Sequence, residues 1–265
     1  MTEAVTNSGT LNAAAIELAG VDVTHYESAS DTVLVREVNW RIGFGEFWVV
    51  GGRQSSGKTS LLLTAAGLNR PSAGTLQILG CDLATASEQD QIGWRRRIGF
   101  VFEHRGRLFN HLSVAQNIAL PLQYHLDIDD SEVAARVDEL LTLTDLQEYA
   151  QRTPSRLSLG VQQRVGLARA LTSSAEVLFL DSPLTTLPLR EMRWWLDFLR
   201  RLRETHRAQD QLLTIVASAD DFRGWLDVAS QFAIVDGGRF DVVGGRGQVE
   251  AATEPTLRDF LANEI

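Results

Sequence analysis

The chain has 265 residues, of which 44% are hydrophobic and 22% charged, enough for the core of one large domain or of one domain with an inserted subdomain. Its formal net charge of −9 argues against a nucleic-acid-binding protein, which usually carries a basic excess or a basic face. The single cysteine, Cys81, excludes a disulfide framework and a cysteine metal site, so we expect it to act as a small apolar residue.

No apolar stretch approaches the roughly 18 residues that suggest a membrane span. Residues 1–15 lack the basic region and the apolar run of a secretory signal. We therefore expect a cytoplasmic protein that reaches a membrane only through a partner, with residues 1–13 as a flexible tail.

The first part of the chain favours β-structure, because apolar residues recur with a period of two or in continuous runs between turn residues. Strands are expected over 16–26, 32–42, 45–52, 75–80 and 96–103. One helix is expected over 58–68, where Gly67 ends it.

From about residue 104 to 164 the pattern is helical, and the segment 129–146 opens with good N-capping residues. Beyond it, strands and helices alternate, which implies a mostly parallel sheet covered on both faces. Helices are expected over 113–122, 129–146, 162–174 and 189–206, and strands over 176–181, 212–218 and 231–240. The helical stretch therefore resembles a subdomain inserted into an α/β core.

Residues 51–60 read GGRQSSGKTS and contain the pattern G-x-x-x-x-G-K-T, which follows an apolar strand and opens a helix. In such a loop the backbone N–H groups and the helix N-terminus surround phosphates. Lys58 is expected to reach the β- and γ-phosphates, and the Thr59 hydroxyl to bind Mg²⁺. The predicted nucleotide-binding residues of this loop are Gly52, Arg53, Gln54, Ser55, Ser56, Gly57, Lys58, Thr59 and Ser60.

Several segments together resemble one family. Residues 45–80 resemble the opening of ABC-transporter ATP-binding subunits, and RLSLGVQQRVGLARAL at 156–171 resembles their signature segment. VLFLDSP at 177–183 resembles their Walker B strand, and LLTIVASADD at 212–221 the strand that carries their switch histidine. The order and spacing fit this family over about 16–249.

The resemblance implies an α/β P-loop NTPase core with a mostly parallel sheet, an antiparallel N-terminal β subdomain and an inserted helical subdomain. The expected boundaries are 14–250 for the ATP-binding domain, about 104–164 for the helical insertion and 251–265 for a short C-terminal helix. It also implies ATP and Mg²⁺ as ligands and transmembrane permease subunits as partners, with the chain peripheral at the inner membrane. A dimer with itself or with a homologous ATP-binding subunit is expected, and no nucleic acid.

The sequence departs from the family at the reacting phosphate. Ser182 stands where the family has its catalytic glutamate, Ala219 where it has the switch histidine, and Glu103 where it has a glutamine that senses Mg²⁺. Pro188 replaces an aspartate that reaches across the dimer. Since positioned acid–base groups typically contribute about 100- to 10,000-fold, we expect weak or absent hydrolysis.

The expected metal ligands are Thr59, the Walker B aspartate Asp181, and Glu103, which either adds negative charge near Mg²⁺ or substitutes for the missing base. In the signature, Ser158 and Gly160 are kept and are expected to contact nucleotide. Two hydrophobic residues, Leu159 and Val161, replace the glycine and the glutamine beside them.

The adenine-stacking residue is expected at the end of the first strand. The start of that strand places His25 there, whereas the family's usual tyrosine suggests Tyr26. We favour Tyr26 because its ring offers the better stacking face, and the alternative is that both are surface turn residues.

His104 and His111 have no carboxylate or cysteine companions, so solvated or interface histidines are expected rather than a metal site. The arginines at 94–97 and 200–203 are expected on solvated helix faces. Of Trp194 and Trp195, one ring is expected in the core and the other half exposed or at an interface.

The first functional hypothesis is therefore an ABC-transporter ATP-binding subunit with weak hydrolysis. Residues 107–122 and 257–261 resemble the Mla/MCE-type lipid transporters most. The alternative is a regulatory or scaffold protein that binds ATP without transport. An ABC-type ATPase of DNA repair or translation lacks support, because the chain has no long coiled-coil insertion, no second cassette and no basic bias.

Overall fold

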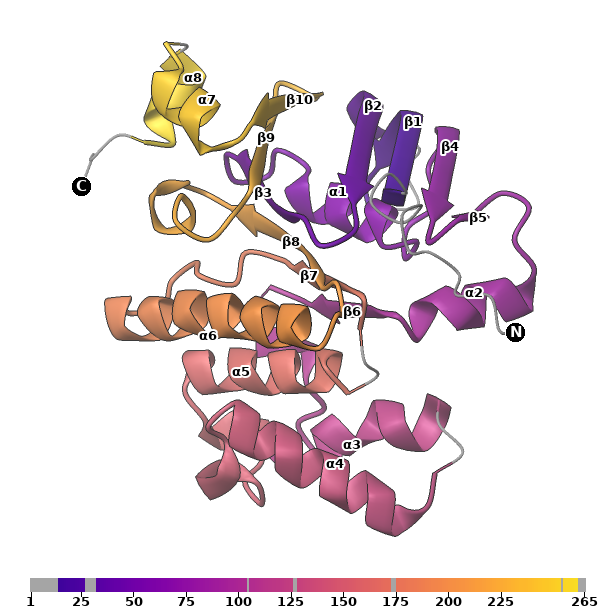
Figure 1. Ribbon diagram of the computed structural model, residues 1–265, viewed down its shortest axis with the longest axis vertical. Coiled ribbons are helices and arrows are strands. Elements are labelled where there is room, and N and C mark those ends of the chain that lie inside the picture. Colours follow the sequence, from indigo (N-terminus) through magenta and orange to yellow (C-terminus); the bar gives the residue numbers. More distant parts are fainter. Residues whose placement is uncertain are drawn as a thin grey trace, which may run out of the picture.

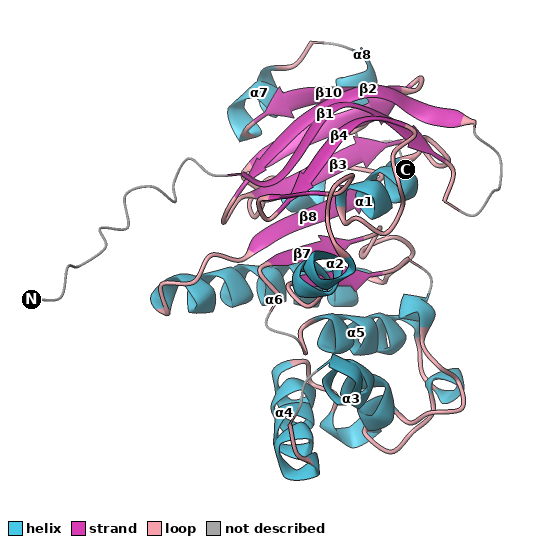
Figure 2. Cartoon of the chain, turned by 90° about the vertical axis from the view of Figure 1, so that its right-hand side faces the viewer, coloured by secondary structure: helices cyan, strands magenta, loops and turns pink. Residues whose placement is uncertain are grey.

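The computed structural model describes residues 14–26, 32–103, 105–125, 128–172, 175–253 and 255–261. They form an α/β domain in which two sheets stack at one end and helices extend from the other (Figure 1). Helices α5 and α6 lie directly against the larger sheet, and α3 and α4 form a lobe beyond α5 (Figure 2). This arrangement confirms the expected fold class.

The smaller sheet is antiparallel and has the strand order β2-β1-β4-β5. Its strands are β1 Ala14–Thr24, β2 Val33–Gly43, β4 Ala73–Ile78 and β5 Cys81–Asp82. Along β1 the buried residues alternate, with Ile16 and Leu18 before a register shift and Val21 and Val23 after it. The shift coincides with Gly20, whose φ of 60° is easily adopted without a side chain.

The larger sheet has the order β10-β9-β3-β8-β7-β6, and only the β10–β9 pair in it is antiparallel among the described strands. Its strands are β3 Phe47–Gly52, β6 Ile98–Val101, β7 Val177–Leu180, β8 Thr214–Ala219, β9 Gln231–Asp236 and β10 Arg239–Gly244. All residues of β3, β7 and β8 are buried, because both faces of these strands are covered.

The helices are α1 Lys58–Ala65, α2 Glu88–Arg95, α3 Val114–His125, α4 Asp130–Leu143, α5 Leu159–Ala170, α6 Leu189–Ala208, α7 Arg246–Ala251 and α8 Pro255–Asp259. As expected from the sequence, α4 begins after a capping residue, Asp129, whose side chain accepts from the Ser131 and Glu132 N–H groups. In α6, Trp195, Phe198 and Leu202 recur at helical spacing and face the core.

Strand β3 divides the hydrophobic core into two clusters. Phe47 and Val49 point into the cluster formed with α3, α4, α5 and α6. Trp48 and Val50 point into the cluster that α1 shares with the smaller sheet. The strand is therefore held from both faces, which fixes the position of the loop that follows it.

Some sequence expectations need correction or addition. Helix α2 was not predicted, although Ser87 and Asp90 form a capping box at its start. Arg203 does not lie on a solvated face: it donates to the carbonyl oxygens of Gly45 and Val228, and its guanidinium lies 5.5 Å from the Phe47 ring centroid. The arginine thereby satisfies backbone carbonyls where α6 crosses the sheet.

Other expectations are confirmed or lie outside the described ranges. Trp195 is fully buried and Trp194 is partly exposed, as expected for this pair. Cys81 lies in β5, where it packs against the core. The predicted tail 1–13 and His104 fall outside the described residues, and the expected domain boundaries stay predictions. Among the described residues, the helices are too short or too polar to span a bilayer.

Candidate nucleotide site

The predicted phosphate loop lies between β3 and α1, at the C-terminal end of the central strand. Gly57 caps α1 with a φ of 105°, which strains any residue that has a side chain. A β-carbon on Gly52 would stand 2.4 Å from Ser56 Oγ and 2.8 Å from the Val235 carbonyl oxygen. Both motif glycines are therefore required by the shape of the loop, as in loops whose backbone closely surrounds a phosphate.

The hydroxyl groups of this loop fit a bound phosphate. Ser56 Oγ is buried and has no hydrogen-bond partner among the described residues, so it is a donor left over for a ligand. Gln54 and Ser55 lie exposed beside it, and Ser60 is buried at the start of α1. Arg53 is exposed and pairs at 3.1 Å with Asp259 of α8.

Lys58 is the only lysine of the chain, and its exposed fraction is 6%. Its Nζ donates to the carbonyl oxygens of Gly52 and Arg53, and it lies 3.1 Å from Asp220 Oδ1. The sequence analysis did not single out Asp220. The two aspartates that directly follow β8 were the available signal, because the C-terminal ends of neighbouring parallel strands meet at one edge of the sheet.

Asp181, at the end of β7, comes together with Thr59 as expected. Thr59 Oγ1 donates to Asp181 Oδ1 at 3.1 Å, and Ser218 Oγ donates to the same oxygen at 2.8 Å. The backbone N–H of Glu103 also donates to this carboxylate, so Glu103 adjoins the predicted metal position. A hydroxyl and a carboxylate at this distance are oxygen ligands suited to Mg²⁺.

The electrostatics of Asp181 also favour a cation. Burial raises the pKa of this carboxyl above its ordinary value of 3.8, against smaller lowering effects from Ser218, Thr59 and Lys58. A buried carboxylate whose charge is incompletely compensated is stabilised by a bound divalent cation. The residues present therefore fit Mg²⁺.

At the position of the family's catalytic glutamate, the structure has two neighbouring hydroxyl groups, those of Ser182 and Ser218. Ser182 is buried, with a φ of 46°, and its backbone N–H donates to Ser218 Oγ at 2.8 Å. The two hydroxyl oxygens of Ser182 and Ser218 lie 3.3 Å apart. Ala219, at the position of the switch histidine, is buried. Neither Ser182 nor Ala219 offers a group that accepts a proton from water near neutral pH.

The retained signature residues lie at the start of α5. Ser158 caps this helix and accepts from the Val161 N–H at 3.4 Å. A β-carbon on Gly160 would stand 3.1 Å from Glu191 Oε2, so α6 approaches the signature closely. Pro188 caps α6, and its carbonyl accepts from the N–H groups at the start of that helix.

The two candidates for adenine stacking both lie exposed at the end of β1. The Arg107 guanidinium lies 5.5 Å from the Tyr26 ring centroid and 4.6 Å from that of Phe102. Tyr26 therefore has a planar cation over its ring, as aromatic platforms often do. The choice between Tyr26 and His25 stays a prediction.

A buried asparagine organises the segment before α3. Asn117 is fully buried, and its Nδ2 donates to the carbonyl oxygens of Phe109, Leu112 and Ser113. Its Oδ1 accepts from the Phe109 N–H at 2.9 Å. Phe109 itself is 49% exposed, so this side chain is displayed on a fixed backbone.

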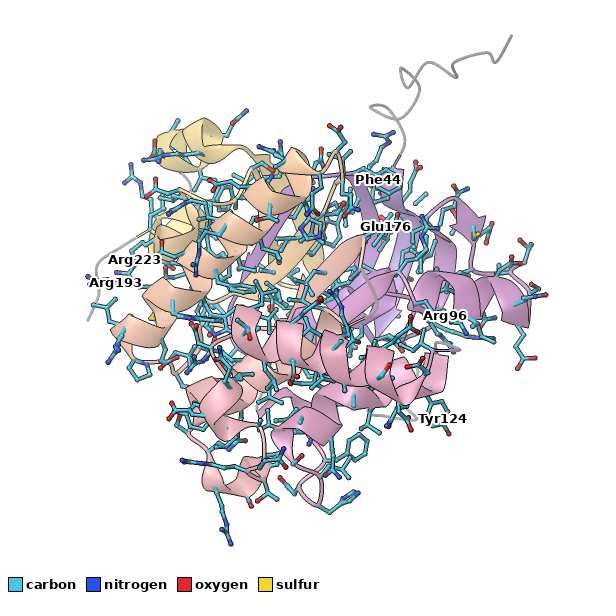
Figure 3. All side chains as sticks on the ribbon, turned by 60° about the horizontal axis from the view of Figure 1, so that its bottom comes forward. Phe44, Arg96, Tyr124, Glu176, Arg193 and Arg223 are labelled. Carbon is cyan, nitrogen blue, oxygen red and sulfur yellow. The ribbon has the colours of Figure 1, made fainter. Side chains whose placement is uncertain are left out.

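A hollow of about 1040 Å³ lies elsewhere, at the N-terminal ends of β6 and β7. Phe44 and Glu176 line it and lie close together in Figure 3, and Arg97 forms a two-bond pair with Glu176 there. None of its lining residues belongs to the phosphate loop. The nucleotide site and this hollow therefore lie at opposite ends of the parallel strands of the larger sheet.

The family model described as ABC transporter matches residues 35–185, more than half of the chain. The chain belongs to the ABC transporter family. Two similar proteins are both named sulfate/thiosulfate import ATP-binding protein CysA. The protein from Caulobacter vibrioides is 38% identical over 223 residues, covering 83% of this chain and 62% of the relative. The protein from Mycobacterium bovis is 37% identical over 235 residues, covering 87% and 63%.

This ABC transporter domain thus spans about three fifths of the length of the curated relatives it matches. Among solved structures, the ATP-binding cassette MJ0796, described as dimeric and bound to ADP and Pi, superposes with a TM-score of 0.75 at 26% identity. That match covers 87% of this chain and 99% of the other. The structure of cbiO1 from Clostridium perfringens, part of the cbiONQ complex, gives 0.75 at 22% identity and supports the fold.

Proposed function

We propose that this chain is the ATP-binding subunit of an ABC transporter, in which MgATP binding and dimerisation act on a membrane permease while hydrolysis is weak or absent. One observation carries the proposal: the binding residues Lys58, Thr59 and Asp181 are assembled, whereas Ser182 and Ala219 replace the reacting groups. Family membership supports ATP as the nucleotide, since ABC ATP-binding domains bind it, typically with Mg²⁺.

Each binding residue has a distinct role in this proposal. Thr59 and Asp181 hold Mg²⁺, which neutralises phosphate charge when bound. Lys58 contacts the β- and γ-phosphates, and Ser56 Oγ supplies a further donor. Because Ser182 has an ordinary hydroxyl rather than a carboxylate, the attacking water lacks a base, and Glu103, whose backbone adjoins Asp181, is the substitute suggested by the sequence. The ligand thus acts mainly by closing the protein around it.

The segment with Phe109 and Asn117 is the proposed docking surface for the permease. It precedes the helical lobe, as in the family that the sequence resembles, and it displays an exposed aromatic ring on a fixed backbone. For the cargo, the relatives named for sulfate and thiosulfate import favour a small oxyanion. The lipid cargo of Mla/MCE-type transporters is the second candidate, supported only by residues 107–122 and 257–261.

Dimerisation is part of the proposal, and the MJ0796 cassette is described as dimeric. Ser158 and Gly160 would contact the nucleotide of a facing subunit through a hydroxyl and a backbone N–H at a helix start. A homodimer would carry two weakened sites, so we favour ATP-promoted self-association. A heterodimer with an intact homologue is the alternative, because one site could then keep its full set of catalytic groups.

The first experiment measures MgATP binding and turnover on one purified sample. We expect millimolar MgATP to raise the melting temperature of the parent chain, because a ligand that binds only the folded state stabilises it. Lys58→Ala should lose the shift, and Arg136→Ala is the control, since Arg136 lies on α4 and pairs with Glu139 away from the loop. An unchanged parent melting curve would refute nucleotide binding.

The same sample is then tested for phosphate release and for association. Turnover of several per second in the parent, absent in Lys58→Ala, would refute the weak-hydrolysis part. Light scattering with MgATP tests self-association, and a chain that dimerises only with a co-purified second cassette favours the heterodimer. Tight MgATP binding without any permease contact in a detergent pull-down would favour the regulatory or scaffold alternative.

A further inference from the structure

Lys58 has no hydrogen-bond donor to spare. Its ammonium group carries three N–H donors, and Nζ has three protein acceptors: the carbonyl oxygens of Gly52 and Arg53 and the carboxylate of Asp220. A phosphate oxygen can therefore bind Lys58 only where one of these acceptors gives way. Two of them belong to the backbone of the loop itself.

Asp220 is the acceptor able to move. Its side chain is 52% exposed, whereas that of Lys58 is 7% exposed. It directly follows β8, which ends at the buried Ala219. A half-exposed carboxylate on a strand end is displaced at lower cost than a loop carbonyl held by the fold.

Asp220 is also the acid whose charge Lys58 compensates directly. The neighbouring Asp221 pairs with Arg223 at 2.9 Å and accepts from the Arg223 backbone N–H. Asp181 accepts hydrogen bonds from Ser218 Oγ and Thr59 Oγ1. A γ-phosphate brought to Lys58 thus meets the Asp220 carboxylate, and like charges at this distance repel.

The same carboxylate touches the loop between β7 and α6. Thr185 Oγ1 lies 3.4 Å from Asp220 Oδ2. This loop contains two residues with left-handed backbone, Ser182 with a φ of 46° and Thr186 with a φ of 63°. Movement of Asp220 away from Lys58 therefore changes a contact to a loop that ends at Pro188, the helix cap.

We propose that Asp220 is an internal counter-anion of the phosphate site, which holds Lys58 until a γ-phosphate replaces it and thereby sets the selectivity between ATP and ADP. The inference rests on the proposed nucleotide site and adds a selectivity-determining residue to it. Any phosphate that binds Lys58 has to take a donor from one of its acceptors, but only ATP brings a γ-phosphate beside this carboxylate, so ATP meets more of its charge than ADP does. The displacement releases Asp220 toward Thr185, so the loop 182–188 responds to the third phosphate.

The test compares MgATP and MgADP affinities of the parent, Asp220→Asn and Asp221→Asn by calorimetry. Asp221→Asn is the matched control, because it removes one neighbouring charge that Arg223 already compensates. We expect Asp220→Asn to bind MgATP about two- to fivefold more tightly, the size expected for removing one partly exposed competing charge. MgADP affinity should change less than about twofold, as should both affinities in the control.

Equal gains for ATP and ADP, or weaker ATP binding by Asp220→Asn, would overturn the inference. A loss of slow turnover in this variant, with unchanged affinity, would instead make Asp220 a substitute base. Asp220→Glu retains the charge, so this variant should bind MgATP with an affinity close to that of the parent.

A second readout does not depend on nucleotide binding. Since Lys58 is the only lysine, an amine-acylating reagent has one side-chain target, which peptide mass spectrometry can quantify against the α-amino group. We expect Lys58 to be acylated several-fold faster in Asp220→Ala than in the parent, because the amine loses its carboxylate partner and is more accessible to the reagent. Equal rates would overturn the counter-anion role, even in a chain that binds no nucleotide.

Discussion

The ring of Phe222 lies directly against the backbone of Gly51: a β-carbon on Gly51 would stand 2.5 Å from Phe222 Cζ. Phe222 also packs on Phe232 and on Phe260, with ring centroids 5.0 Å and 5.2 Å apart. The strand that delivers the phosphate loop is thus held by an aromatic cluster. Glycine at position 51 is required by that packing rather than by its backbone angle.

Gly51→Ala is therefore expected to reduce the free energy of unfolding by about 1–3 kcal/mol through overpacking. Urea unfolding measures the change. Phe222→Leu in the same chain makes room for the methyl group, so the double variant should be more stable than the sum of the two single effects predicts. Strict additivity would contradict the contact. Gly247→Ala, where an added β-carbon meets nothing within 4 Å, is the control.

Asp181→Asn should separate two effects of the buried carboxylate: the stability that it costs the protein without ligands, and the stabilisation by MgATP that it allows. Burial raises the pKa of Asp181 in the folded state, so the folded protein binds this proton more tightly than the unfolded chain does. The resulting stabilisation is complete at pH values below the pKa of Asp181 in the unfolded chain. That contribution is lost as the pH rises through the raised value. Without Mg²⁺ and nucleotide, we expect Asp181→Asn to be at least as stable as the parent at pH 7, with the difference shrinking on acidification.

The same variant should gain no stability from MgATP, because its amide replaces the carboxylate ligand. Melting curves at pH 7 and pH 5, with and without MgATP, check both parts. A variant that is much less stable than the parent at pH 7 in the absence of ligands would show that the carboxylate is fully compensated by its neighbours.

Restoring the two family residues tests the proposal that hydrolysis is weak. Ser182→Glu supplies a carboxylate to orient water, and Ala219→His supplies an imidazole near the γ-phosphate. Because such groups act as a unit, we expect each single variant to change turnover little and the double variant to raise it by about 100-fold or more. Phosphate release is the measurement, with Lys58→Ala added to the double variant as the background control. A parent that already turns over rapidly would contradict the premise.

Trp194 joins α6 to the turn after α4. Its Nε1 donates to Asp145 Oδ2 at 2.7 Å, its ring stacks on Phe198 at 5.0 Å, and Arg164 lies 5.0 Å from its ring centroid. Trp194→Phe keeps the stacking and loses the hydrogen bond, so we expect a loss of about 1 kcal/mol in urea unfolding. In the Trp194→Phe background this hydrogen bond is already lost, so Asp145→Ala should lower the free energy of unfolding there only through its effect on the backbone at position 145. Full additivity would show that the bond contributes nothing.

The phosphate loop was predictable because its pattern, its preceding strand and its following helix agree within 20 residues of sequence. The family resemblance also assigned Asp181 and Thr59 to one metal site, which stays a prediction, and the structure brings the two side chains within hydrogen-bond distance. The roles of Asp220, Ser218 and Arg203 were not predicted. Each depends on contacts between segments far apart in the chain, such as the 162 positions between Lys58 and Asp220. Local periodicity carries no information on such pairs.

Helix α2 illustrates the other kind of miss. Its residues Glu88–Arg95 bury only Trp94, so the apolar period that identifies a helix is nearly absent. The capping box of Ser87 and Asp90 was the remaining signal. The helix exists because its single buried tryptophan packs in the core formed by α1 and the smaller sheet.

The four hydrogen bonds of Asn117 have a thermodynamic consequence for association. The backbone from Phe109 to Ser113 is already ordered by a buried side chain, so a partner that binds the exposed Phe109 ring does not have to order this segment. Fixing the backbone of one residue costs roughly 1–2 kcal/mol of conformational entropy. In this segment that entropy is already lost when the domain folds, before any partner binds. Association at this surface should therefore proceed as rigid docking, with a heat-capacity change that reflects buried apolar area alone.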